Sequence, residues 1–323
     1  MNSLLVMKQQ LMRFYTKFEA YIVPALKFLA MLFALIFINS NIGFMSKLKN
    51  PAIVLILSLL CSFMPTNVIV IFAGMVIIGH LYALSLECAV VVFFIFIIMY
   101  ALYFRFTPKD AIAVLLTPVA FAMHIPYVIP LSMGFVGNPL SVMSVGCGTA
   151  VYFILNYIKG HQDSLSSSGI DVDSAVSGFK TVIDGIIKND AMIVMIIAFS
   201  VTIVLVYLIR KMKINYSWTI ALGAGSVMCL LIVIIGAAAL DADISIVGAI
   251  FGMLVSVLLV LVLHFFIFNV DYSRAEYVQF EDDEYYYYVK AVPKVTLDAP
   301  NSRARRNRPI RERFDDDDFD DYD

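Results

Sequence analysis

Five polar side chains stand in or beside the apolar segments of this chain and are the first candidates for chemistry: Asn67, His80, Glu87, His124 and Asn138. A carboxylate and a histidine held together in a membrane can bind a cation or pass a proton, because histidine changes its charge near neutral pH. The sequence therefore predicts a proton- or cation-linked site formed by Glu87 with His80 or His124. The alternative is that these are interfacial groups with ordinary hydrogen bonds, since no carboxylate falls in the middle of an apolar segment.

Catalytic and metal-binding patterns are missing from the sequence. It contains no P-loop, nucleophile elbow, HExxH or Rossmann glycine pattern, so we do not expect an enzyme. The four cysteines, at positions 61, 88, 147 and 229, lie singly in apolar stretches without the paired spacing of a zinc site or a disulfide framework. We expect no cofactor, no metal and no nucleic-acid partner.

The elements that must position the polar side chains are apolar helices. Of the 323 residues 61% are hydrophobic and 15% are charged, a composition that places the chain in a lipid bilayer. A helix needs about 20 apolar residues to cross the hydrocarbon core. Seven runs meet this length, at 24–45, 67–85, 87–105, 139–158, 192–210, 218–240 and 245–268. The sequence predicts an all-α, polytopic integral membrane bundle.

Two further apolar stretches are interrupted by proline, which removes a helical hydrogen bond and bends or breaks the helix. The stretch 51–64 is followed directly by Pro65, and 111–137 contains Pro118, Pro126 and Pro130. Counting these broken segments, we expect eight to ten spans.

The positive-inside rule orients the bundle. With the N-terminus in the cytoplasm, the basic run 210–213 also lies in the cytoplasm if 111–137 forms a re-entrant hairpin or two short crossings. The C-terminal tail is then cytoplasmic too. Lys47 and Lys49 violate this arrangement, because their loop would be external.

An internal repeat is suggested by sliding the chain against itself by 59 residues, which aligns 52–98 with 111–157. Ala52, Leu57 and Cys88 meet identical residues. If the units share ancestry they are antiparallel, as in secondary transporters with broken helices. Chance similarity between apolar helices is the alternative. In the last span, Gly248 and Gly252 form a GxxxG face that packs either within the bundle or between subunits.

The chain is expected to divide into six regions. An amphipathic N-terminal segment (1–21) precedes a membrane domain (22–158), an extramembrane loop (159–191), a second membrane part (192–268), a cytoplasmic β-hairpin (269–297) and a charged tail (298–323). Asp173 is the expected N-cap of an amphipathic helix in the loop. That helix is either a lid or partner surface, or a linker lying on lipid headgroups.

The hairpin is predicted from two aromatic and β-branched stretches separated by EDDE. A lone two-stranded hairpin is marginal in water, so we expect it to dock on a neighbouring surface. The docking residues would be Tyr277, Phe280, Tyr285, Tyr286, Tyr287 and Tyr288. The basic and acidic blocks after residue 300 would serve either partner binding or solvation.

The string EYVQFEDDEYYYYVKAVPKV, following a last span that ends in FNVDYSR, resembles the end of a family of uncharacterised polytopic membrane proteins of clostridial, Lachnospiraceae-like bacteria. These are commonly labelled permease-like. The resemblance implies a bacterial inner-membrane location and a cytoplasmic tail, and it transfers no site residues.

Two functions remain as hypotheses. The first is a permease-like protein or transport-complex subunit of the bacterial cytoplasmic membrane, which needs a polar cavity near Pro65, Asn67, His124, Pro126 and Asn138. The alternative is a structural or assembly protein that homo-oligomerises and uses its hairpin tail to bind neighbouring subunits or a soluble cytoplasmic partner. Such a protein needs a dry bundle.

Overall fold

The computed structural model describes residues 2–166, 180, 182–268, 276–281 and 286–291. The chain forms two compact units. One comprises residues 15–267, and the other combines residues 1–14 with the C-terminal part from Phe268.

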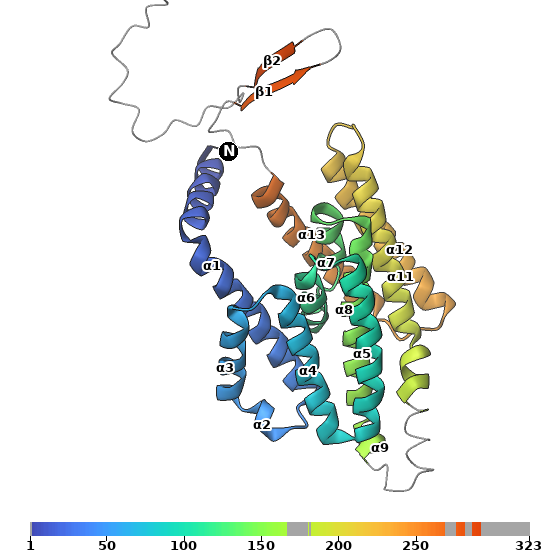
Figure 1. The fold of residues 1–323 in the computed structure, drawn as a ribbon. Helices are drawn as coiled ribbons and strands as arrows, with labels where there is room; N and C mark the ends of the chain where they lie inside the picture. Colours follow the sequence, from blue (N-terminus) through green and yellow to red (C-terminus); the bar gives the residue numbers. More distant parts are fainter. Residues whose placement is uncertain (1, 167–179, 181, 269–275, 282–285, 292–323) are drawn as a thin grey trace, which may run out of the picture. The chain divides into compact units, whose positions relative to one another are not determined.

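The described chain from Asn2 to Phe268 is built from helices (Figure 1). Their bounds are α1 (Asn2–Ile42), α2 (Ser46–Lys49), α3 (Pro51–Ser62), α4 (Thr66–Leu84), α5 (Leu86–Phe106), α6 (Ala111–Ala122), α7 (Val128–Val136), the 3-10 turn η1 (Pro139–Ser141), α8 (Val142–Gly160), α9 (Gln162–Ser166), α11 (Asp190–Lys211), α12 (Ser217–Ala239) and α13 (Ile246–Phe268).

Seven of the described helices are long and apolar enough to cross a membrane, and they coincide with the seven predicted runs. The chain is therefore a multi-pass membrane protein. The finer expectation of eight to ten spans depends on the short helices. Both α3 and α6 have 12 residues, or about 18 Å of helix against a hydrocarbon core of about 30 Å. Neither crosses alone.

Helix α1 is interrupted at Phe18, whose φ of −114° and ψ of 19° are not helical. This break lies close to the expected boundary between an N-terminal segment and the first span. Further along, α1 contacts the turn between α3 and α4. The Ser62 hydroxyl donates to the Pro24 carbonyl at 2.7 Å, and the Lys27 ammonium donates to the Met64 carbonyl at 3.1 Å.

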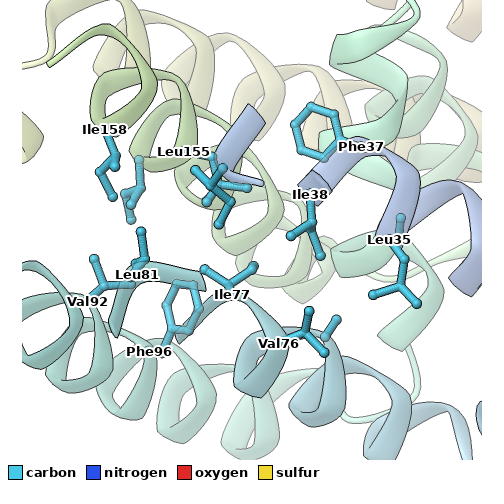
Figure 2. Close-up of a cluster of buried hydrophobic side chains, with 14 of the residues drawn as sticks. Leu35, Phe37, Ile38, Val76, Ile77, Leu81, Val92, Phe96, Leu155 and Ile158 are labelled. Carbon is cyan, nitrogen blue, oxygen red and sulfur yellow. The ribbon is translucent and has the colours of Figure 1, made fainter. Parts of the chain in front are cut away.

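The main core lies where α1, α4, α5 and α8 meet (Figure 2). Leu35, Ile77, Leu81, Phe96 and Leu155 are buried there, at most 3% exposed. The spacing of Ile77 and Leu81 places both on one face of α4. Large apolar side chains also cover the outer surface, where lipid would replace water. Because both sides are apolar, close packing has to hold these helices together.

The loop between α8 and α11 packs onto the bundle through part of its length. Leu165, Val182 and Ile186 belong to the main core, whereas Ile183 and Ile187 are exposed. Residues 182–187 are helical, so this amphipathic segment is anchored by one face. The predicted N-cap, Asp173, lies outside the described residues.

The smaller unit contains two strands at the predicted positions. Strand β1 (Glu276–Glu281) pairs antiparallel with β2 (Tyr286–Ala291). The register sets Tyr277 opposite Lys290, Gln279 opposite Tyr288, and Phe280 opposite Tyr287. Tyr285 lies outside the described residues. Docking of this hairpin remains a prediction.

Candidate functional site

Helices α6 and α7 form a hairpin that enters and leaves the bundle at the same end. The Ser141 hydroxyl, which follows α7, donates to the Asp110 carboxylate, which precedes α6, at 2.6 Å. The Ser144 hydroxyl donates to the Thr107 hydroxyl at 2.5 Å. These bonds join the two ends of segment 111–137, which is the arrangement of a re-entrant hairpin or of two short crossings and not of a single crossing.

The base of the hairpin is tied to α4 as well. The Tyr103 hydroxyl lies 2.7 Å from Asn67 Oδ1 and 3.1 Å from the Pro108 carbonyl, so its one proton serves these two acceptors. Tyr103 is 1% exposed. A buried hydroxyl with acceptors on two elements fixes the start of α4 against the end of α5.

The tip of the hairpin is a tight turn. His124 has a φ of 59°, in the left-handed region, and its N–H donates to the Phe121 carbonyl at 3.0 Å. Pro126 follows within the turn. Because proline has no N–H and disfavours helix at the residue before it, α6 cannot continue into α7 without a break.

A small cavity lies beside the hairpin, between α1, α4, α5, α6 and α8, with a volume of about 50 Å³. Its wall is apolar, apart from Tyr100, Tyr103 and Cys147. The Tyr100 hydroxyl donates to the Val70 carbonyl at 3.0 Å, and the Cys147 thiol points to the Met99 carbonyl at 3.7 Å. The polar groups of this wall are neutral, and each already donates to an acceptor of the protein.

The two proposed repeat units have related arrangements. Each begins with a 12-residue helix, α3 or α6, and ends with a long helix, α5 or α8. The end of α5 contacts the start of α8 through Thr107 and Ser144, so these corresponding helices run antiparallel. The units differ in the middle, where α4 is continuous and its counterpart is divided into α7 and η1.

The five polar residues predicted to form a site do not come together. Asn67 stands in the first turn of α4 and His80 in its last turn, about 20 Å apart at 1.5 Å per residue. Glu87 stands in the first turn of α5, at the same end of the bundle as His80. His124 is exposed at the hairpin tip, and Asn138 is exposed at the hairpin base. None of the five lines the small cavity beside the hairpin, and the wall of that cavity is largely apolar.

Local hydrogen bonds account for several of these side chains. His80 is fully buried, and its Nδ1 accepts the Met45 N–H at 3.2 Å. Glu87 accepts from the Ser85 hydroxyl at 2.5 Å, at the N-cap of α5. The backbone N–H of Asn138 donates to the Ser141 hydroxyl at 3.1 Å. The proton- or cation-linked pairing of Glu87 with a histidine has no support in this geometry.

Only some of the prolines that were expected to break a helix do so. Pro65 is the N-cap of α4 and Pro126 lies in the hairpin turn, as expected. Pro118, however, lies inside α6, and Pro130 lies in the first turn of α7. A first-turn proline gives up no helical bond, and packing from neighbouring helices holds α6 together around Pro118.

The two glycines of the GxxxG pair have different surroundings. A Cβ added at Gly252 would lie 2.6 Å from the His124 carbonyl oxygen, so α13 packs directly on the hairpin turn there. Gly248 is exposed and faces only its own N-cap, Ser245. Gly252 thus serves packing inside the bundle.

Sequence reasoning missed two charged residues, Lys27 and Asp110. Lys27 interrupts an apolar helix, which was a readable signal. Asp110 precedes a short helix and looked like an ordinary loop residue. Within the described ranges, no three histidine, cysteine or acidic side chains are grouped to hold a metal ion.

Comparison with known proteins adds no relative. No family model, curated protein or solved structure matches this chain.

Proposed function

We propose that this chain is a permease-like protein, or the membrane subunit of a transport complex, in the bacterial cytoplasmic membrane. The observation that carries the proposal is the pair of antiparallel units, α3–α5 and α6–α8. Each begins with a helix too short to cross the membrane, and together with α1 they enclose a cavity. Broken helices in inverted units around a central site are a recurring plan of transporters.

The substrate class follows from the wall of the cavity. Hydroxyl and thiol groups of Tyr100, Tyr103 and Cys147 are its polar features, so a small, neutral and largely apolar solute fits better than an ion. The volume of about 50 Å³ has room for one or two water molecules at about 30 Å³ each. Transport therefore requires the two units to separate.

The expected orientation has both termini in the cytoplasm, which requires α3, with the turns that flank it, to return the chain across the membrane between α1 and α4. The ring of Phe135, at the end of α7, stacks on Trp218 at 5.4 Å, and the Arg210 guanidinium lies 5.5 Å from the Trp218 ring. The base of the hairpin and the turn between α11 and α12 thus share one end of the bundle. Lys109 and Lys211 also belong to these two connections, which favours that end as the cytoplasmic one.

Cysteine accessibility tests the proposed opening of the cavity. Two variants would each keep one native cysteine: Cys147 in the cavity wall, which is partly exposed, or Cys229 on α12, which is fully buried and serves as the unreactive control. In sealed vesicles, a water-soluble maleimide should label Cys147 much faster than Cys229 if the units separate. Equal, negligible labelling of both would contradict the permease proposal.

The small volume and apolar wall of the cavity also favour the second candidate, a structural or assembly protein with a dry bundle. In that case neither cysteine reacts, and the β1–β2 hairpin carries the function. Truncation after Ser273 should then change the mass of the purified oligomer, measured by light scattering in mild detergent. An unchanged mass and unchanged co-purifying chains would remove this candidate.

A further inference from the structure

A groove of about 650 Å³ runs along the outside of the larger unit, between α1, the start of α4 and α6. Its walls are apolar, with Phe33 on α1, Ile69 on α4 and Leu115 on α6. Leu26 and Ile112, which also line it, are each 56% exposed. The groove therefore opens toward the surroundings of the bundle, which in a membrane are acyl chains.

The polar side chains of the groove wall are Lys27, Thr66 and Tyr15, and Lys27 is the one charged side chain among the described residues of that wall. The Lys27 ammonium donates one hydrogen bond, to the Met64 carbonyl at 3.1 Å, and an ammonium has three donors. The nearby Asp110 carboxylate accepts from Ser141 instead.

Lys27 lies at a depth that suits a lipid headgroup. Its partner Met64 belongs to the turn that precedes α4, and Ala111, in the same groove, begins α6. Turns and helix starts at one end of a bundle mark the membrane interface, where a lysine head can remain hydrated. The apolar part of the groove continues from there toward Phe33 on α1.

We propose that this groove binds one anionic phospholipid of the bilayer. Its phosphate contacts the Lys27 ammonium and the Thr66 hydroxyl, and an acyl chain lies against Phe33, Ile69 and Leu115. A helix from a second copy is a poorer occupant, since no acidic side chain on the described groove wall competes for Lys27 and a protein helix would desolvate its charge. The proposal does not depend on transport.

Native mass spectrometry of the full chain in mild detergent tests the proposal. The probes are dioleoylphosphatidylglycerol and dioleoylphosphatidylcholine, which share acyl chains and differ in charge. Wild type should retain the anionic lipid preferentially, and Lys27→Met should lower that retention about fivefold, the effect of one lysine near an anionic headgroup. Lys109→Met, which removes an exposed charge from the same end of the bundle, should leave it unchanged.

Two more variants keep the result decisive if Lys27→Met fails to fold. Lys27→Arg should bind the anionic lipid like wild type, and Ala30→Trp, which fills the groove, should lower retention of both lipids. Equal retention of the two lipids by wild type would overturn the proposal. So would equal losses in Lys27→Met and Lys109→Met, displacement by inorganic phosphate alone, or a lipid-free dimer that Ala30→Trp dissociates.

Discussion

Replacing Gly252 by alanine should destabilise the bundle, whereas the same change at Gly248 should not. The new methyl group at Gly252 would lie 2.6 Å from the His124 carbonyl and 3.4 Å from the Tyr127 ring. The carbonyl belongs to the backbone of a tight turn, and α13 cannot rotate away without losing its other contacts. At Gly248 the methyl group meets the Ser245 hydroxyl at 3.3 Å, a contact that a shift of a few tenths of an ångström relieves while the cap is kept.

The magnitudes follow from two opposing effects. Alanine is better than glycine inside a helix by up to about 1 kcal/mol, while overpacking a close contact costs about 1–3 kcal/mol. At Gly252 overpacking dominates, and the free energy of unfolding should fall by about 1–2 kcal/mol. At Gly248, in the exposed first turn of α13, the change should stay within about 0.5 kcal/mol of wild type.

The native cysteines provide the assay. Cys61, Cys88 and Cys229 are fully buried, so in a background that lacks the partly exposed Cys147 a maleimide dye that becomes fluorescent on reaction reports thermal unfolding of the bundle. Gly252→Ala should unfold at a clearly lower temperature than Gly248→Ala and wild type. Equal transitions in the two variants would show that α13 does not contact the hairpin turn as described. Loss of an oligomer in both variants would assign the GxxxG face to a subunit interface.

Three further substitutions test the hydrogen bonds around the candidate site with the same dye assay. Tyr103→Phe removes the hydroxyl that Asn67 accepts at 2.7 Å and should lower stability by about 1 kcal/mol, and a neutral result would exclude a structural role for that bond. Asp110→Ala should cost about 1.5–3 kcal/mol because Ser141 loses a charged acceptor, and Asp110→Asn should restore much of it if geometry matters more than charge. Ser85→Ala should cost about 1 kcal/mol because its hydroxyl caps α5, and no shift in the unfolding transition would refute the cap.

The sequence was a good guide to the helices and strands but a poor one to the site. Seven apolar runs became seven long helices, because spanning length is a local property of the chain. Pro126 marked the turn between α6 and α7 for a similarly local reason. Pro118 was expected to break a helix but lies inside α6, because whether a helix continues through a proline depends on the helices packed around it.

The polar residues failed as a predicted site because their spacing along the chain does not give their positions in the bundle. His80 and Asn67 belong to one helix and lie at its opposite ends. Nothing in the sequence singles out Asp110, yet its carboxylate accepts the hydrogen bond from Ser141 that joins the two ends of the α6–α7 hairpin.

What the sequence determined by itself was therefore the membrane class, the seven long helices and the two strands. Tertiary structure alone decided which faces pack, as Gly252 and Gly248 illustrate, and where Lys27 meets an open groove. The physical reason is that a membrane removes the usual contrast between core and surface. When both sides of a helix are apolar, hydropathy does not show which side faces the protein and which faces lipid. Close packing then decides which helices become neighbours.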